Sequence, residues 1–149
     1  MEADVFEILK QDHDNVSRLF DQLEASFDDA EREALFIQVR DLLYTHIELE
    51  ESVLYSMLKD IGETRDMMFN SYDEHKVVKT LLDELVVLER DSPDWDDRFL
   101  LLREKVEQHV YEEEGEVFET ARDVLSEDQI QALTTQLRTR KVRAASSGR

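Results

Sequence analysis

The sequence predicts an all-α fold, an up-down-up-down four-helix bundle followed by a short C-terminal fifth helix. Two observations predict it. The 149 residues suit one domain and include only three Gly and one Pro, fewer than the turns of a β architecture need. Apolar residues recur three and four positions apart along four long segments, which is the spacing of a helix face that packs on a core. Short turns between long amphipathic helices favour antiparallel neighbours.

The first two predicted helices cover about residues 3–27 and 29–59, and Gly62 is a natural stop after the second. His13 lies on the apolar stripe of the first helix, four residues after Leu9. His46 lies on the stripe of the second, and Glu50 follows it one turn later on the same face.

The third predicted helix covers about residues 63–89, with His75 on its stripe. Ser92 can cap the fourth helix, and Pro93 suits the first helical position. A capping-box pattern at 126–129 begins the fifth helix. We expect residues 1–125 to form the bundle, 126–143 to form a short helix on or beside it, and 144–149 to form a disordered tail, with fraying after Arg138.

The charge and the absence of cysteine exclude several classes of function. There are 37 acidic against 18 basic residues, a net charge of −19, and no Cys. Such an acidic chain repels phosphate backbones and anionic lipid surfaces, so we expect neither nucleic acid nor membrane as a partner. Disulfides, iron–sulfur clusters and thiol catalysis are excluded. No stretch is long and apolar enough for a membrane span, and the first residues lack the pattern of a signal peptide, which predicts a cytoplasmic location.

The first half of the chain resembles the second. THIELEESVLY at 45–55 aligns with QHVYEEEGEVF at 108–118, and DHDNV at 12–16 aligns with EHKVV at 74–78. Each half therefore has a His on its first helix and a His-x-x-x-Glu on its second. The six residues that share this pattern are His13, His46, Glu50, His75, His109 and Glu113. The helical rise of about 1.5 Å per residue places all six at similar distances from the predicted turns, within about two helical turns along the bundle.

Metal binding explains this set of residues. Two inward carboxylates that face each other would repel, and each would be costly to bury alone. Two bridging carboxylates with two imidazoles for each of two cations resolve both problems, and such ligands suit iron, manganese or zinc. A single His on an apolar face is usually a core residue, but here all four His of the chain join the pattern. The Glu-x-x-His motif of ferritin-like bundles is absent, since Lys10, Leu43, Tyr72 and Val106 stand three residues before the histidines.

These motifs resemble the hemerythrin-like family, also called HHE cation-binding domains. The resemblance rests on DHD at His13, HIELEE at 46–51, DEH at His75 and HVYEEEGEVF at 109–118, and it covers about residues 5–125. It implies a centre of two iron ions (Fe²⁺/Fe³⁺), bridged by oxo or hydroxo and by carboxylates. His13, His46, His75 and His109 would be the nitrogen ligands, and Glu50 and Glu113 the bridges.

The chain departs from the oxygen-carrying members of the family, which have a fifth His one turn from the ligand on the third helix. Here Ser71 and Lys79 stand at the two candidate positions. Water, Tyr72 or another carboxylate could take that place, and Glu116 could be a further ligand or a neighbour of the ligands.

Four functions are consistent with these features. The missing imidazole favours reaction with hydrogen peroxide, in catalase- or peroxidase-type turnover, with no catalytic residue predicted beyond the metal centre. The family resemblance also suggests reversible binding of O₂ or nitric oxide for storage or sensing. An iron reservoir and a metal-free or zinc-bound structural bundle are the remaining alternatives.

Overall fold

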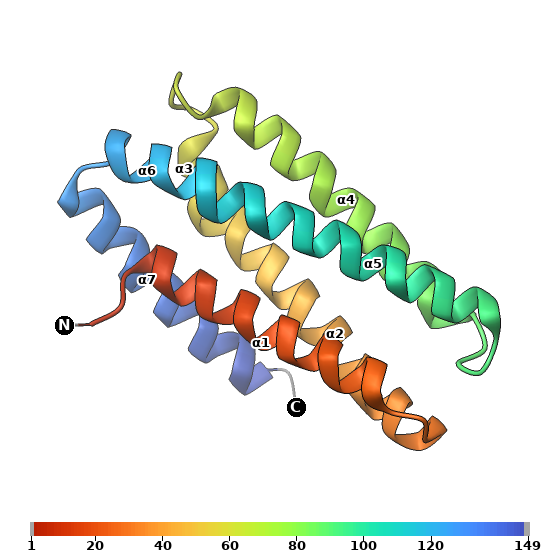
Figure 1. Ribbon diagram of the computed structural model, residues 1–149. Coiled ribbons are helices and arrows are strands. Elements are labelled where there is room, and N and C mark those ends of the chain that lie inside the picture. The colour runs from red at the N-terminus through yellow and green to blue at the C-terminus, as the bar shows by residue number, and fades with distance from the viewer. Residues whose placement is uncertain (1, 148–149) are drawn as a thin grey trace.

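The computed structural model describes residues 2–147, and within them the chain is helical apart from its turns. Four long helices lie side by side in an up-down-up-down arrangement, with α1 beside α2 and α4 beside α5 (Figure 1). Their bounds are α1 Val5–Ala25, α2 Asp29–Leu49, α4 Arg65–Val87 and α5 Pro93–Glu112. The predicted fold class is confirmed. Over the described residues, no helix combines the length and the apolar character that crossing a membrane requires.

The second and fourth rods of the bundle each contain a π-helical segment at the same place. The segment η1 (Glu50–Tyr55) follows α2 and leads into α3 (Ser56–Leu58), and η2 (Glu113–Val117) follows α5 and leads into α6 (Phe118–Val124). Each begins at the Glu of a His-x-x-x-Glu motif. Such widened turns are rare in helices and frequent at functional sites.

The predicted helix starts are confirmed by their caps. The Ser92 hydroxyl accepts a hydrogen bond from the Trp95 N–H at 3.2 Å, with Pro93 at the start of α5. Ser126 and Gln129 form the reciprocal bonds of a capping box, at 2.9 and 3.1 Å.

The C-terminal helix α7 (Glu127–Ser147) has 21 residues and is as long as α1. It therefore continues beyond residue 143, where the sequence predicts its end, and the small residues 144–147 (AASS) are helical rather than a disordered tail. Docking explains the difference: Leu133 and Leu137 are buried, and α7 packs against α1, α2 and η1 outside the bundle (Figure 1). Residues 148 and 149 of the predicted tail lie outside the described residues.

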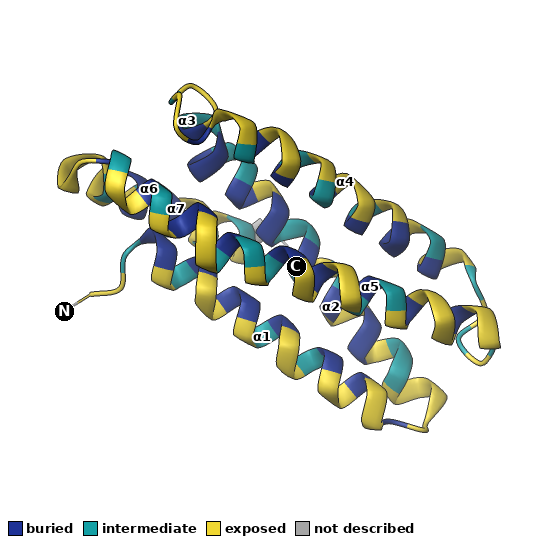
Figure 2. Cartoon of the chain, turned by 45° about the horizontal axis from the view of Figure 1, so that its top comes forward, coloured by how far each residue is buried: buried dark blue, intermediate teal, exposed yellow. Residues whose placement is uncertain are grey.

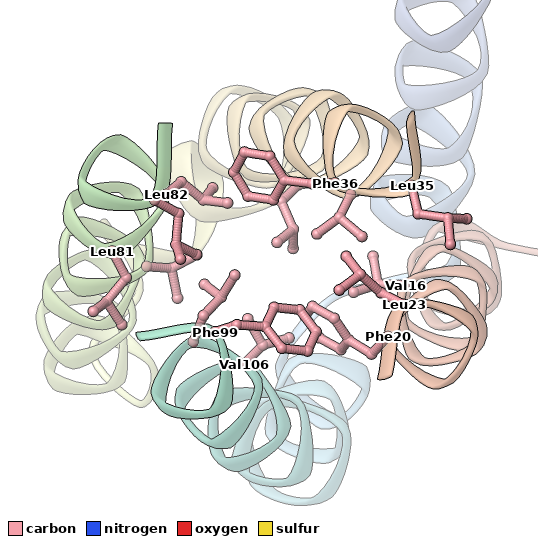
Figure 3. Close-up of a cluster of buried hydrophobic side chains, with 14 of the residues drawn as sticks. Val16, Phe20, Leu23, Leu35, Phe36, Leu81, Leu82, Phe99 and Val106 are labelled. Carbon is pink, nitrogen blue, oxygen red and sulfur yellow. The ribbon is translucent and has the colours of Figure 1, made fainter. Parts of the chain in front are cut away.

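Two apolar clusters fill the bundle and leave a polar layer between them. Figure 2 shows the buried residues on the inward faces of the helices, and Figure 3 shows one cluster with side chains from α1, α2, α4 and α5 pointing to a common centre. The other cluster lies at the end where α7 docks and includes Leu9, Leu49 and Met68. On α1, His13 lies between Leu9 of the second cluster and Val16 of the first. The same holds for the other ligand helices, so the functional layer is enclosed on both sides by packed core.

Candidate metal centre

The structure brings together all six residues of the repeated pattern. Their side chains are buried and divide into two groups of possible ligand atoms, each within 4.8 Å of one another. The first group is His13, His46, Glu50 and Glu113, and the second is His75, His109, Glu50 and Glu113. Because the two Glu belong to both groups, they have the position that bridging carboxylates require. We refer to the subsite of His13 and His46 as the first subsite and that of His75 and His109 as the second subsite.

The four imidazoles all turn Nε2 toward the centre. His13 Nε2 lies 3.1 Å from His46 Nε2 and 3.1 Å from Glu113 Oε1. In the second subsite, His75 Nε2 lies 3.0 Å from Glu50 Oε1, and His109 Nε2 lies 3.3 Å from Glu113 Oε2. Nitrogen and oxygen donors therefore converge from four helical rods on one small volume.

Every Nδ1 atom points outward to a carboxylate. His46 Nδ1 lies 2.9 Å from Asp12 Oδ2, and His109 Nδ1 lies 2.6 Å from Glu74 Oε1. The other two pairs are His13 with Glu114 and His75 with Glu51, both at 2.7 Å. A carboxylate that accepts the Nδ1 hydrogen fixes the ring and leaves Nε2 free to bind a cation.

The outer carboxylates follow the repeat, although the sequence analysis did not identify them. Asp12 and Glu74 each precede a ligand His, and Glu51 and Glu114 each follow a bridging Glu. An acid next to each of these four site residues was the one sign in the sequence of the outer carboxylates. Each outer carboxylate binds a histidine of another helix, which residue spacing along one helix does not reveal.

Tyr55 is the other residue that the sequence analysis missed. Its ring stacks on His75 with centroids 5.1 Å apart, and its hydroxyl group donates a hydrogen bond to Glu113. The same oxygen lies 3.4 Å from the Nε2 atoms of both His75 and His109. In an α-helix, Tyr55 would point about 140° away from Glu50, five residues earlier. The π turn of η1 changes this direction and brings the phenol to the centre.

Glu116 and Tyr72, which the sequence suggested, and the two remaining tyrosines do not face the centre. Glu116 is exposed. Tyr72 is partly exposed and packs edge-on against the Tyr55 ring, so it supports the site without facing it. Tyr44 bonds to Asp83, and Tyr111 is exposed.

Ser71, one of the two candidate positions for the absent fifth His, lies beside Tyr55. Ser71 is buried, and its hydroxyl group interacts with the phenol of Tyr55. Lys79 is only partly buried. A small residue at 71 thus leaves room for the Tyr55 ring beside His75.

Without a bound cation, the charges of the six residues compensate one another. Burial lowers the pKa of His46, but the carboxylates of Glu50 and Asp12 outweigh this effect and raise it to about 10. Burial raises the pKa of Glu50, but the charge of His46 and hydrogen bonds from the histidines hold it well below its usual value. Burial and the nearby charges of Glu113 and Glu50 raise the pKa of Tyr55 well above its usual value, so the phenol keeps its proton.

For two carboxylate oxygens of this centre, a bound cation is a better partner than the hydrogen-bond donors nearby. Glu50 Oε2 and Glu113 Oε1 are buried and form no hydrogen bond of normal geometry over the described residues, although Glu113 Oε1 lies 3.1 Å from His13 Nε2. Unpaired buried carboxylate oxygens are costly. Both oxygens face His13 Nε2, at 3.9 and 3.1 Å, so a cation held by the first group of ligands would satisfy them. The donor set, imidazole with carboxylate, suits iron, manganese or zinc.

A small apolar cavity of about 20 Å³ lies against the four histidines. Its other walls are aliphatic side chains from all four rods: Val16, Leu43, Ile47, Val78, Val106 and Val110. This volume holds about one water-sized molecule. The walls offer no charged group outside the imidazoles, so the cavity suits a small uncharged molecule.

Comparisons with known proteins identify the fold and the family. The chain is 29% identical over 143 residues to a protein of Nostoc sp. named DNA nickase; the match covers 94% of this chain but only 40% of that relative's length. A crystal structure of a hemerythrin HHE cation binding domain-containing protein from Mycobacterium kansasii has the same fold, with a TM-score of 0.84, 22% identity, and coverage of 98% of this chain and 90% of that one. The family model described as the hemerythrin HHE cation binding domain matches residues 4–121. The chain belongs to the hemerythrin HHE cation-binding domain family.

Proposed function

We propose that this chain holds two iron ions in its two subsites and reacts with hydrogen peroxide, in catalase- or peroxidase-type turnover. The shared position of Glu50 and Glu113 in both groups of ligands supports a metal pair. The mixed donor set supports cations in both subsites. The unpaired carboxylate oxygens that face His13 support a cation in the first subsite.

The bound iron pair would supply the two-electron redox change that converts two molecules of peroxide into two of water and one of O₂. The protein side chains provide the setting for it. Asp12, Glu51, Glu74 and Glu114 hold the imidazoles in one tautomer. The two apolar clusters enclose the layer. The aliphatic cavity lies on the side of the first cluster and Tyr55 on the side of the second, so a peroxide that Tyr55 serves would bind at the metal pair rather than in the cavity.

The observation that carries the proposal is the buried hydroxyl group of Tyr55. Reduction of peroxide to water consumes protons, and Tyr55 Oη is a protonated donor 3.4 Å from the Nε2 atoms of both second-subsite histidines. Glu113 accepts its hydrogen bond and holds the phenol in place. Oxidation of a second peroxide to O₂ releases the protons that would return to the phenol. A positioned proton donor contributes about 10²–10⁴-fold to a rate. Tyr55 is therefore our candidate for the catalytic proton donor.

The test is peroxide turnover by protein loaded anaerobically with two equivalents of Fe(II) and freed of excess metal. We expect many equivalents of peroxide to disappear, with half an equivalent of O₂ evolved for each in the catalase case. In the peroxidase case, consumption would require an added electron donor. The control is the Glu113→Ala variant given the same amount of iron. Its peroxide consumption measures the reaction of iron that is not held in the site. Peroxide left untouched over many equivalents would contradict the proposal.

Reversible binding of O₂ or nitric oxide is a second candidate, and the apolar cavity beside the histidines favours it. A cavity of this size and polarity suits an uncharged diatomic molecule as well as it suits peroxide. The reduced, iron-loaded protein would then form a stable adduct with either gas that is released under vacuum. Absence of a new absorption band with both gases would exclude this role.

Two further functions have less support. DNA nicking, the activity in the name of the Nostoc relative, is opposed by the net charge of −19, which repels a phosphate backbone. A reservoir of iron is opposed by the ligand supply, which serves two ions. A cytoplasmic location is part of our proposal, and fractionation of cells would test it.

A further inference from the structure

The C-terminal helix α7 brings a cation to one side of the metal centre. Lys141 Nζ lies 2.7 and 2.9 Å from the two carboxylate oxygens of Asp12. The Asp12 side chain is only 6% exposed, and the Lys141 side chain is 33% exposed. The ammonium group thus enters from the surface and ends on a buried carboxylate.

Asp12 connects this cation to the first subsite. The same Oδ2 atom that contacts Lys141 accepts the hydrogen of His46 Nδ1 at 2.9 Å. The path from α7 to the ligand is therefore two polar contacts long, from Lys141 to Asp12 and from Asp12 to His46.

The second subsite lacks such a cation in the part of the chain that the structure describes. Glu74 corresponds to Asp12 in the repeat and accepts from His109 Nδ1 at 2.6 Å. Over the described residues no Lys or Arg forms a salt bridge with Glu74, whose one ionic contact is with His109. The two outer carboxylates with the same task thus differ in whether an ammonium group contacts them.

We propose that Lys141 is a positioning residue that makes the two subsites unequal, by withdrawing charge from Asp12 and so weakening His46 as a ligand. A carboxylate on Nδ1 raises the basicity of a metal-binding imidazole, and a cation on that carboxylate opposes the effect. The first subsite then binds its cation less tightly than the second. This inference rests on the proposed metal pair.

A purely structural role for Lys141 is less consistent with the contacts of α7. Other residues already fasten this helix. Leu133 and Leu137 are buried, and the Val5 N–H donates to the Thr134 hydroxyl at 2.8 Å. Arg138, one turn before Lys141, binds Glu2 at 3.0 Å. Arg138 therefore offers a matched control, an ion pair of α7 that does not touch the site.

The experiment is an anaerobic equilibrium titration with Co(II), a spectroscopic probe that needs no redox turnover. We expect the wild-type chain to bind two ions with different affinities. Lys141→Met should tighten the weaker step by about tenfold, the lower end of the usual effect of an outer partner. Lys141→Arg should retain the wild-type constants, and Arg138→Met should leave both steps unchanged. Lys141→Gln is the second neutral variant, in case the Met variant folds poorly.

The outcomes separate the two proposals. If the wild-type chain fails to bind two ions, the metal pair itself is wrong. If it binds two and the neutral variants match it, Lys141 has no influence and the inference is wrong. If the neutral variants bind the weaker Co(II) ion less tightly than the wild type does, the inference is also wrong, because Lys141 then only supports the structure of the site.

Discussion

The two halves of this molecule are alike in what they offer a metal and different in what surrounds it. The first half is α1, α2 and η1, and the second is α4, α5 and η2. Each contributes two histidines, one glutamate shared by both groups of possible ligands, two outer carboxylates and a π turn at an equivalent position. The ligand arrangement is therefore close to twofold symmetric.

The differences lie one layer outward. Tyr55 in the first half corresponds to Phe118 in the second, and both rings stack on a histidine of the site. Tyr55 places a hydroxyl group beside the second subsite, whereas Phe118 offers the first subsite no polar group. The helix α7 has no counterpart in the repeat and packs on the first half. A symmetric pair of hairpins thus acquires two chemically distinct subsites from its neighbours.

Removal of Glu50 or Glu113 should have the largest effect, because each belongs to the ligand groups of both subsites. We expect Glu50→Ala or Glu113→Ala to lose both ions, whereas His46→Ala should lose mainly the ion of its own subsite. Loss of a ligand present at 100 times its Kd removes about 2.7 kcal/mol, which corresponds to a fall of roughly 5–10 °C in Tm.

Metal analysis and calorimetry on the same samples would check this prediction. The control is Glu116→Ala, a nearby exposed acid outside the site. An unchanged iron content in the Glu113→Ala variant would remove Glu113 from the ligand set.

Exchange of the two aromatic residues should change the reaction without changing metal content. Tyr55→Phe should still bind two ions but turn over peroxide about 10²-fold more slowly, because the proton donor is lost. Phe118→Tyr adds a hydroxyl group to the other half and should leave the rate within a few-fold of the wild type. Initial rates of O₂ evolution at equal iron content measure the difference. Equal rates for the wild type and Tyr55→Phe would exclude Tyr55 as the donor.

The sequence predicted which residues meet in the centre because they obey α-helical spacing on apolar faces. His13, His46 and His75 fall on stripes of Leu and Val, and the repeat assigns the same role to equivalent positions. Burial of charged residues without partners is costly, so six such residues in one layer indicated a metal site.

The same spacing could not predict Tyr55. The π turn of η1 alters the relation between Glu50 and Tyr55, and a 3.6-residue period does not describe that segment. The outer carboxylates were hidden for another reason, since Glu51 and Glu114 bind histidines that are distant in the chain. The length of α7 was underestimated because its apolar stripe ends at Leu137, whereas the helix goes on through Lys141, which contacts Asp12 of α1, to Ser147.

The outer carboxylates should produce smaller effects that fall on one subsite each. Glu51 serves His75 and Glu114 serves His13. We expect Glu51→Gln to weaken binding at the second subsite, and Glu114→Gln at the first, by about tenfold each. Stepwise Co(II) titration would resolve the two. A pair of variants that both weaken the same step would show that the subsites are not assigned as the repeat suggests.

The pH dependence of stability should be the mildest effect and should vanish when metal is bound. In the metal-free chain, Glu50 and Asp12 raise the pKa of His46 from 6.5 to about 10, and the other three histidines shift in the same direction. A raised pKa in the folded state stabilises fully below pH 6.5, and the stabilisation is lost as the pH rises to about 10. The Tm of metal-free protein should therefore fall by several degrees across this range. The metal-loaded protein has the same surface charge and is the control, because cations replace the protons on its histidines and its Tm should stay nearly constant. A metal-free chain whose Tm stays flat or rises between pH 6.5 and 10 would show that the buried imidazoles of the two halves are not held protonated by the carboxylates they face.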